Sequence, residues 1–190
     1  MSKHNNMESA TKKYFWNLAG SAGLMLGMIS SASMFTGQGI SAMNLSATMT
    51  TVIGGALWLA ETCGCVGMMY YYMKKFSSEF PALDYKVISR FGAAIAFLSA
   101  LIYSAVTFAN MAYISADFYA EQFSILTQNL APSLDSNSKV MLERIMAAMP
   151  QISFFSNLIY CTIFGSVVSS VISRGIIAKN QISANRPDEQ

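Results

Sequence analysis

Four long apolar stretches, separated by polar segments, dominate the hydrophobic pattern of this chain. They cover residues 14–36, 49–73, 91–114 and 152–173, and Glu61 is the one charged residue within them. A helix needs about 20 mostly apolar residues to cross the roughly 30 Å hydrocarbon core of a bilayer. Each stretch meets that length. We therefore predict an all-α membrane protein whose four transmembrane helices form an antiparallel bundle.

The segment 115–150, between the third and fourth stretches, is too polar to cross a bilayer. We predict two short helices in it, separated by a break at 131–133. The second of these helices has apolar residues at helical spacing, namely Met141, Leu142, Ile145, Met146 and Met149. This stripe could lie on the membrane surface, dock a partner or pack against the chain's own bundle, and we favour the last alternative.

The composition agrees with a membrane protein. Hydrophobic residues make up 53% of the chain and charged residues only 12%, whereas soluble domains carry about 25% charged residues. The high apolar content also excludes an intrinsically disordered chain. The basic residues form no long run, so nucleic-acid binding has no electrostatic basis.

Lysine and arginine are distributed very unevenly along the chain. Ten of the 12 lie in segments 1–13, 74–90 and 174–190, and only Lys139 and Arg144 lie elsewhere. Loops rich in Lys and Arg stay on the cytoplasmic side of a membrane. We therefore predict that both termini are cytoplasmic and that the two-helix segment between spans three and four is extracytoplasmic.

These assignments divide the chain into one membrane domain with two tails. We predict a cytoplasmic N-terminal tail at 1–13, a four-span membrane domain at 14–178 and a cytoplasmic C-terminal tail at 179–190. The last residues, 181–190, are polar, and we expect them to be disordered.

Glycines in the spans predict where the helices pack closely. Lipid chains are as apolar as leucine, so transmembrane helices associate through close packing and polar contacts. The glycines that we expect at such contacts lie in three different spans: Gly23, Gly27, Gly54, Gly64 and Gly165. They predict a tight bundle but do not distinguish a transporter from a scaffold, because both need such contacts.

Glu61 is the most informative residue for function because it lies near the middle of the second span. A charged side chain at this depth is costly and normally faces the protein interior. No span contains a basic residue that could pair with it, so we expect a protonated, hydrogen-bonded carboxyl group. Its candidate partners near the midplane are Tyr103, Ser104, Thr162 and Ser166.

This intramembrane polar site has two interpretations. Glu61 could carry a proton or a cation, or it could be a neutral polar clamp between helices. We favour the clamp because no second acidic residue lies in the spans.

No other residues form a catalytic or metal-binding pattern. Cys63 and Cys65 lie on one helix and point about 200° apart, so we expect them and Cys161 to be small packing residues. The single histidine, His4, lies in the N-terminal tail. We therefore predict no catalytic residues, no metal site and no cofactor, and an enzyme is the least supported function.

Several segments share features with a known family over about residues 12–178. They are the aromatic pair before the glycine-rich first span, the end of the second span, the loop after it, the acidic segment after span three and the serine-rich end of span four: Phe15, Trp16, 70–75, 80–87, 114–119 and 166–173. Together they resemble a family of small four-span bacterial membrane proteins catalogued as domain of unknown function 4199. Ala116 stands where members of that family often have proline.

The resemblance implies placement in a bacterial inner membrane and implies no activity. Members of that family often accompany membrane-associated glycosyltransferases, so the resemblance also implies an enzyme of this kind as a partner.

Two functions remain open. We predict a non-enzymatic accessory or scaffold subunit of the bacterial cell envelope that works with a membrane-associated enzyme. The alternative is a small proton- or cation-coupled transporter that uses Glu61. Four spans enclose little room for a substrate path, so a transporter would have to act as an oligomer. The expected partners are the lipid bilayer and either another membrane protein or a second copy of the chain.

Overall fold

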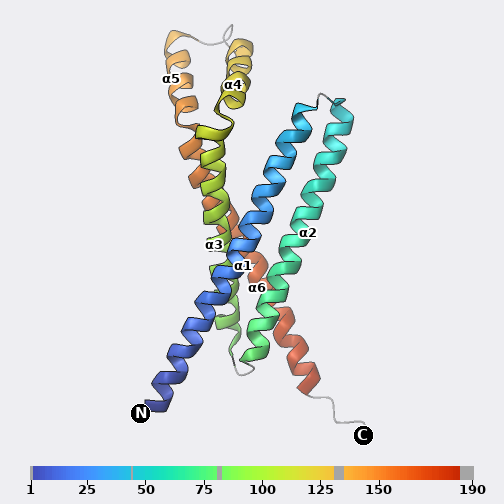
Figure 1. Ribbon diagram of the computed structural model, residues 1–190, viewed down its shortest axis with the longest axis vertical. Helices are drawn as coiled ribbons and strands as arrows, with labels where there is room; N and C mark the ends of the chain where they lie inside the picture. The colour runs from blue at the N-terminus through green and yellow to red at the C-terminus, as the bar shows by residue number, and fades with distance from the viewer. Residues whose placement is uncertain (1, 44, 81–82, 131–134, 185–190) are drawn as a thin grey trace.

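The computed structural model describes the backbone of residues 2–43, 45–80, 83–130 and 135–184 and the side chains of most of them. All elements in this part of the chain are helical (Figure 1): α1 (Ser2–Ala42), α2 (Ala47–Glu79), α3 (Tyr85–Ala109), the π-helical segment η1 (Asn110–Ile114), α4 (Ala116–Leu130), α5 (Ser136–Ala147) and α6 (Met149–Ala184). Four helices are long and apolar enough to cross a membrane. The predicted all-α membrane fold is therefore confirmed.

The membrane helices are longer than the apolar stretches that predicted them. α1, α2 and α6 have 41, 33 and 36 residues, which corresponds to roughly 62, 50 and 54 Å at 1.5 Å per residue. The hydrocarbon core is only about 30 Å thick, so their ends extend past it. α6 continues to Ala184, and residues 181–184, expected to be disordered, are helical. Residues 185–190 lie outside the described part.

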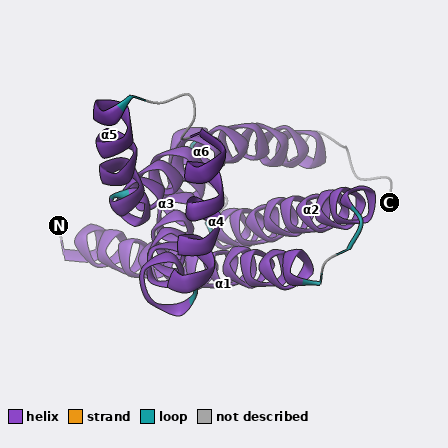
Figure 2. Cartoon of the chain, turned by 90° about the horizontal axis from the view of Figure 1, so that it is seen from above, coloured by secondary structure: helices purple, strands orange, loops and turns teal. Residues whose placement is uncertain are grey.

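α3 is the central helix of the bundle. It packs most extensively against α6 and then against α1, while α2 packs mainly against α1. Both termini and the α2–α3 loop lie at one end of the molecule, here called the terminal end, and α4 and α5 lie at the other, the hairpin end (Figure 1). Figures 1 and 2 both show that α1 and α2 diverge from α3 and α6 toward the hairpin end.

An aromatic cluster fastens three helices together at the terminal end. The rings of Phe76 and Phe91 are fully buried and stacked, with centroids 4.3 Å apart. Phe15 packs edge-on against both rings at 5.7 and 5.3 Å, and Tyr14 contacts Phe80 at 5.6 Å. Such aromatic pairs contribute about 0.5–1.5 kcal/mol each beyond their burial. The cluster therefore joins α1, α2 and α3 close to the α2–α3 loop.

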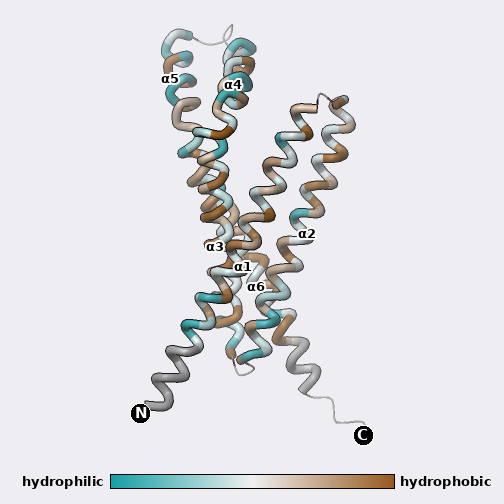
Figure 3. Tube along the Cα trace, viewed as in Figure 1, coloured by the Kyte–Doolittle hydropathy of each residue, from teal (hydrophilic) through white to brown (hydrophobic). Residues whose placement is uncertain are grey.

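The hairpin-end half of α2 is exposed on nearly every face. Between residues 47 and 60 only Thr50 and Leu57 are partly covered, and Val52 and Trp58 are 65% and 64% exposed. Figure 3 shows that hydrophobic residues continue along this part of the helix. The bundle is thus well packed at the terminal end and open toward the hairpin end.

The five glycines expected at helix contacts fall into two groups. A Cβ atom at Gly23, Gly27 or Gly165 would lie 2.6, 2.8 or 2.5 Å from the nearest Cβ atom of α3. A side chain at these positions would separate α1 or α6 from α3. In contrast to the expectation, Gly54 and Gly64 have nothing within 4 Å of that position, so neither glycine is at a helix contact.

α4 and α5 form a hairpin that stands on α3 and α6 without covering the bundle (Figure 1). We had favoured packing of the apolar stripe of α5 against the bundle, but α5 has no buried residue. Met146 of the stripe contacts the Thr127 hydroxyl of α4 at 3.4 Å, whereas Met141 and Ile145 are 65% and 41% exposed. The predicted break at 131–133 lies outside the described residues.

Candidate functional site

Glu61 lines a pocket between all four membrane helices. It lies near the middle of α2, where the helix pairs begin to diverge, and its side chain is half-buried. The pocket has a volume of about 180 Å³. Its walls are largely apolar, and the remaining polar or thiol-bearing residues around it are Ser30, Thr62, Cys65, Ser99 and Cys161. Glu61 is thus the single acidic group in an apolar intramembrane pocket.

Glu61 forms no hydrogen bond or ion pair with any residue whose side chain is described. The hydrogen-bonded clamp that we expected is therefore not formed among these residues. Cys161 of α6 lines the same pocket as Glu61, whereas Tyr103 of α3 does not.

The four candidate partners of Glu61 do not all converge on it. None of the four lines the Glu61 pocket, and the Ser166 hydroxyl donates to the carbonyl oxygen of Thr162 in its own helix at 2.7 Å. The side-chain oxygens of Ser104 and Thr162 are buried without a hydrogen-bond partner. Similar depth in the membrane is therefore insufficient to bring these residues together, because helix rotation also decides where each side chain points.

Two of the three cysteines face the Glu61 pocket. Cys65 Sγ lies 3.8 Å from the Ser30 hydroxyl of α1, and Cys161 lines the pocket from α6. Cys63 is exposed, and all three are free thiols. Among the described side chains, no three His, Cys, Asp or Glu residues gather into a group that could hold a metal. The pocket suits a mainly apolar occupant that offers Glu61 a hydrogen-bond donor or a positive charge.

A second polar cluster, which we did not expect from the sequence, lies toward the hairpin end. The Tyr119 hydroxyl accepts hydrogen bonds from Gln38 Nε2 at 2.7 Å and from Asn110 Nδ2 at 3.4 Å. The Ser115 hydroxyl donates to Asn110 Oδ1 at 2.9 Å. Asn110 is fully buried and begins η1, and π-helical turns occur frequently at functional sites.

This cluster ties the base of the hairpin to α1 and η1. A signal for it exists in the sequence, since Asn110 is the one amide side chain within the stretch 91–114. Nothing in the sequence indicates that its partners come from α1 and α4.

Comparisons with known proteins give no information on function, so the functional interpretation depends on the geometry of the structure. No protein-family model, curated protein or solved structure matches it. The resemblance to the family catalogued as domain of unknown function 4199 therefore stays a prediction. The four apolar helices make the chain a multi-pass membrane protein.

Proposed function

We propose that this protein is a non-enzymatic accessory subunit that binds a transmembrane helix of a partner beside α2. The proposal rests on one observation: Glu61 is only partly buried near the middle of α2 and has no hydrogen-bonding partner among the described residues. An ionisable side chain at this depth is costly and almost always pairs with another group. A donor on a partner helix would offset that cost.

The surface around Glu61 supports docking of a helix. Residues spaced alternately by three and four lie along one stripe of a helix, and on α2 this stripe comprises Gly54, Leu57, Glu61, Gly64 and Met68. The two glycines are exposed and the other three residues are half-buried. Small residues let the backbones of two membrane helices approach closely. The open space above both glycines would therefore accommodate a partner.

The charge distribution supports placement in the bacterial inner membrane with the termini in the cytoplasm. Ten of the 12 Lys and Arg residues lie in segments 1–13, 74–90 and 174–190. The described parts of these segments lie at the terminal end, which the positive-inside rule assigns to the cytoplasm. In this orientation the hairpin projects from the outer face, and an envelope enzyme would be a suitable partner.

Co-purification in mild detergent tests the docking proposal. We expect a stoichiometric membrane-protein partner with the wild type and with Glu61→Gln, because an amide still forms hydrogen bonds. We expect its loss with Glu61→Ala and with Gly64→Leu, which fills the open face. Gly67→Leu is the matched control, since Gly67 is equally open but lies about 120° around the helix from Glu61. Equal losses with Gly64→Leu and Gly67→Leu would contradict the proposal.

The Glu61 pocket favours a second candidate function, a proton- or cation-coupled transporter acting as an oligomer. Glu61, Cys65 and Cys161 share a pocket halfway along the helices, and a transporter would need water to reach it. A membrane-impermeant thiol reagent would then label Cys65 or Cys161 rapidly in intact membranes. In the accessory subunit we expect all three cysteines to resist it, with lipid covering the exposed Cys63.

Replacement of Glu61 by glutamine distinguishes the two functions further. A transporter in which Glu61 carries the proton or cation loses function in Glu61→Gln, because an amide cannot titrate. The accessory subunit retains it. Growth and envelope integrity of a deletion strain complemented with each variant provide the measurement, with thermal unfolding of the purified variants as the control for folding. Full complementation by Glu61→Gln would exclude the Glu61-coupled transporter.

A further inference from the structure

A second pocket lies where the membrane helices meet the hairpin. Its volume is about 370 Å³, and α3, η1, α4, α5 and α6 all contribute to its walls. Pockets that hold small ligands typically measure about 300–1,000 Å³. It shares no lining residue with the Glu61 pocket, and the docking surface on α2 does not include it. We call it the junction pocket.

The residues of the junction pocket explain why it is hollow. Four alanines from η1, α4 and α5 line it, and their methyl groups leave space that larger side chains would fill: Ala112, Ala116, Ala120 and Ala147. Most of the remaining wall is aromatic or thioether, with Phe108, Met111, Phe123 and Met146. Such a lining favours an apolar occupant, because every methylene group removed from water contributes to binding.

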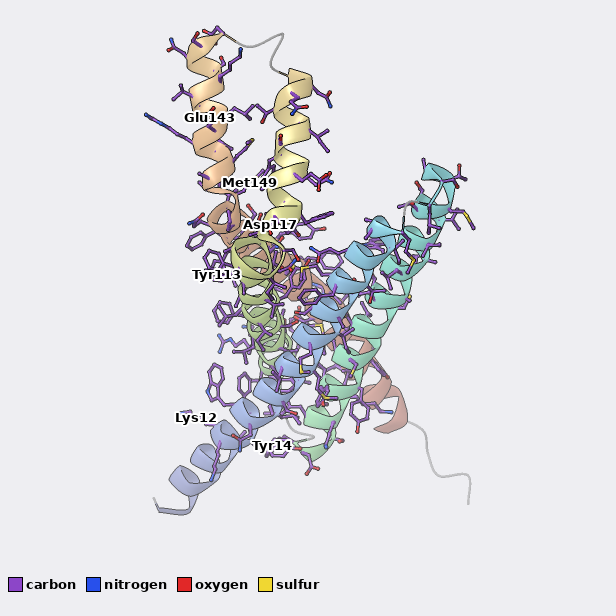
Figure 4. All side chains as sticks on the ribbon, turned by 45° about the horizontal axis from the view of Figure 1, so that its top comes forward. Lys12, Tyr14, Tyr113, Asp117, Glu143 and Met149 are labelled. Carbon is purple, nitrogen blue, oxygen red and sulfur yellow. The ribbon has the colours of Figure 1, made fainter. Side chains whose placement is uncertain are left out.

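Polar residues are also present around this apolar space. Tyr113 and Gln151 belong to its lining, and both are exposed. Tyrosine is enriched where a membrane meets water, and Tyr113 is the second-last residue of a membrane span that ends at Ile114. Figure 4 shows Tyr113, Asp117 and Met149 at this junction of the spans with the hairpin. The junction pocket therefore lies at the boundary between the hydrocarbon and the headgroups.

One wall of the junction pocket is held in place by hydrogen bonds. Tyr119 lines it, and the Tyr119 hydroxyl is bonded to Gln38 of α1 and Asn110 of η1. These bonds hold α4 against the ends of two membrane helices. A preformed wall lowers the entropy lost when a flexible ligand binds.

We propose that the junction pocket binds one acyl chain of a phospholipid from the leaflet on the hairpin side. The chain lies among the alanines and aromatic rings, and the ester and headgroup remain beside Tyr113 and Gln151. A phospholipid fits this site because its own boundary between apolar and polar parts lies at the same membrane level. Bound there, the lipid fills the space between the hairpin and the membrane helices.

A phospholipid with a photoreactive group in its acyl chain tests the proposal. We expect it, after reconstitution with the full-length protein and irradiation, to label peptides within residues 108–123 and 146–151. An excess of the same phospholipid without the photoreactive group should suppress this labelling, because a single site saturates.

A variant that fills the junction pocket gives the second measurement. We expect Ala120→Leu combined with Ala147→Leu to reduce labelling of these peptides about tenfold, the effect of losing roughly two buried methylene groups. Both alanines are exposed in the absence of lipid, so the fold tolerates leucine there. Ala105→Leu is the matched control, because Ala105 is an exposed alanine of α3 that does not line the pocket.

Two results would overturn the proposal. One is equal labelling of the wild type, the filled variant and Ala105→Leu. The other is labelling that excess lipid does not suppress and that spreads evenly over the spans, as expected for bulk lipid. If the filled variant fails to fold, the position and saturation of the wild-type labelling decide the question by themselves.

Discussion

Small residues control how closely α1 and α6 approach α3. On the α6 side, a Cβ atom at Gly92 would collide with Ser169 and Met73. Ser169 is fully buried, and its hydroxyl donates to the carbonyl oxygens of Ser166 at 2.9 Å and Ser89 at 3.3 Å. A serine whose hydroxyl bonds to nearby backbone can be buried without a polar side chain opposite it. Glycine and serine thus bring the two helix backbones together.

The same reasoning predicts opposite effects of alanine at two glycines. Gly27→Ala places a methyl group 2.8 Å from Ile102 Cβ, and such overpacking costs about 1–3 kcal/mol. Gly64→Ala meets no neighbour and replaces a poor helix former, so we expect a change between zero and a gain of about 1 kcal/mol. Thermal unfolding of both purified variants in the same detergent measures the difference. An unchanged stability of Gly27→Ala would show that the α1–α3 contact is looser than described.

Among the elements, α5 depends most on local interactions. It has 12 residues and none of them is buried, and isolated helices shorter than about 12–15 residues are marginal in water. The amide of Ser138 donates to Asp135 Oδ1 at 2.9 Å and caps its first turn. Met146 provides a contact with Thr127 of α4. The cap therefore contributes a large part of the stability of α5.

The cap makes the first turn of α5 sensitive to acid. Hydrogen bonds from the side chain and the amide of Ser138 hold the pKa of Asp135 below its ordinary value. Because the folded-state pKa is lowered, the stabilisation is present above the unfolded pKa and is lost as the pH falls through the folded pKa. We expect faster amide exchange in residues 137–141 over that range, after correction for intrinsic rates, by nuclear magnetic resonance. Asp135→Asn should keep the cap and lose its pH dependence, whereas unchanged pH dependence in Asp135→Asn would contradict this.

On the scale of the whole molecule, the bundle is fastened at one end. The aromatic cluster, including Phe76 and Phe91, lies at the terminal end, and the two helix pairs diverge toward the hairpin end (Figures 1 and 2). This asymmetry places both the Glu61 pocket and the junction pocket away from the tightest packing. Both sites thus lie where the chain has space for another molecule.

The orientation of the whole molecule is testable with reporter fusions. Since Lys and Arg gather at the terminal end, fusions after Ser78 and Gln190 should report the cytoplasm. Fusions after Met43 and Ser136, which lie at the hairpin end, should report the outside. Alkaline phosphatase and green fluorescent protein are a suitable pair of reporters, because each is active on only one side of a bacterial inner membrane. A cytoplasmic signal from Ser136 would reverse the proposed orientation.

Much of the fold was predictable because the bilayer imposes a strict rule. Backbone groups in hydrocarbon must bond within the chain, so apolar stretches of about 20 residues become helices. Helix ends were less predictable, since α1 and α6 continue into polar residues where water and not lipid is the solvent. Glu61 was recognisable as a candidate site residue because it is an ionisable residue within an apolar stretch, where burying its charge costs free energy.

The sequence by itself determined the four membrane helices and the position of Glu61 within the second, since both follow from the hydropathy along the chain. Only the tertiary structure decided which residues share a pocket with Glu61, which glycines meet another helix, and that Gln38, Asn110 and Tyr119 bond to one another. Those outcomes depend on the rotation, tilt and separation of helices. In a membrane, where the spans are apolar on almost every face, no amphipathic pattern reveals which face of a helix turns toward its neighbour.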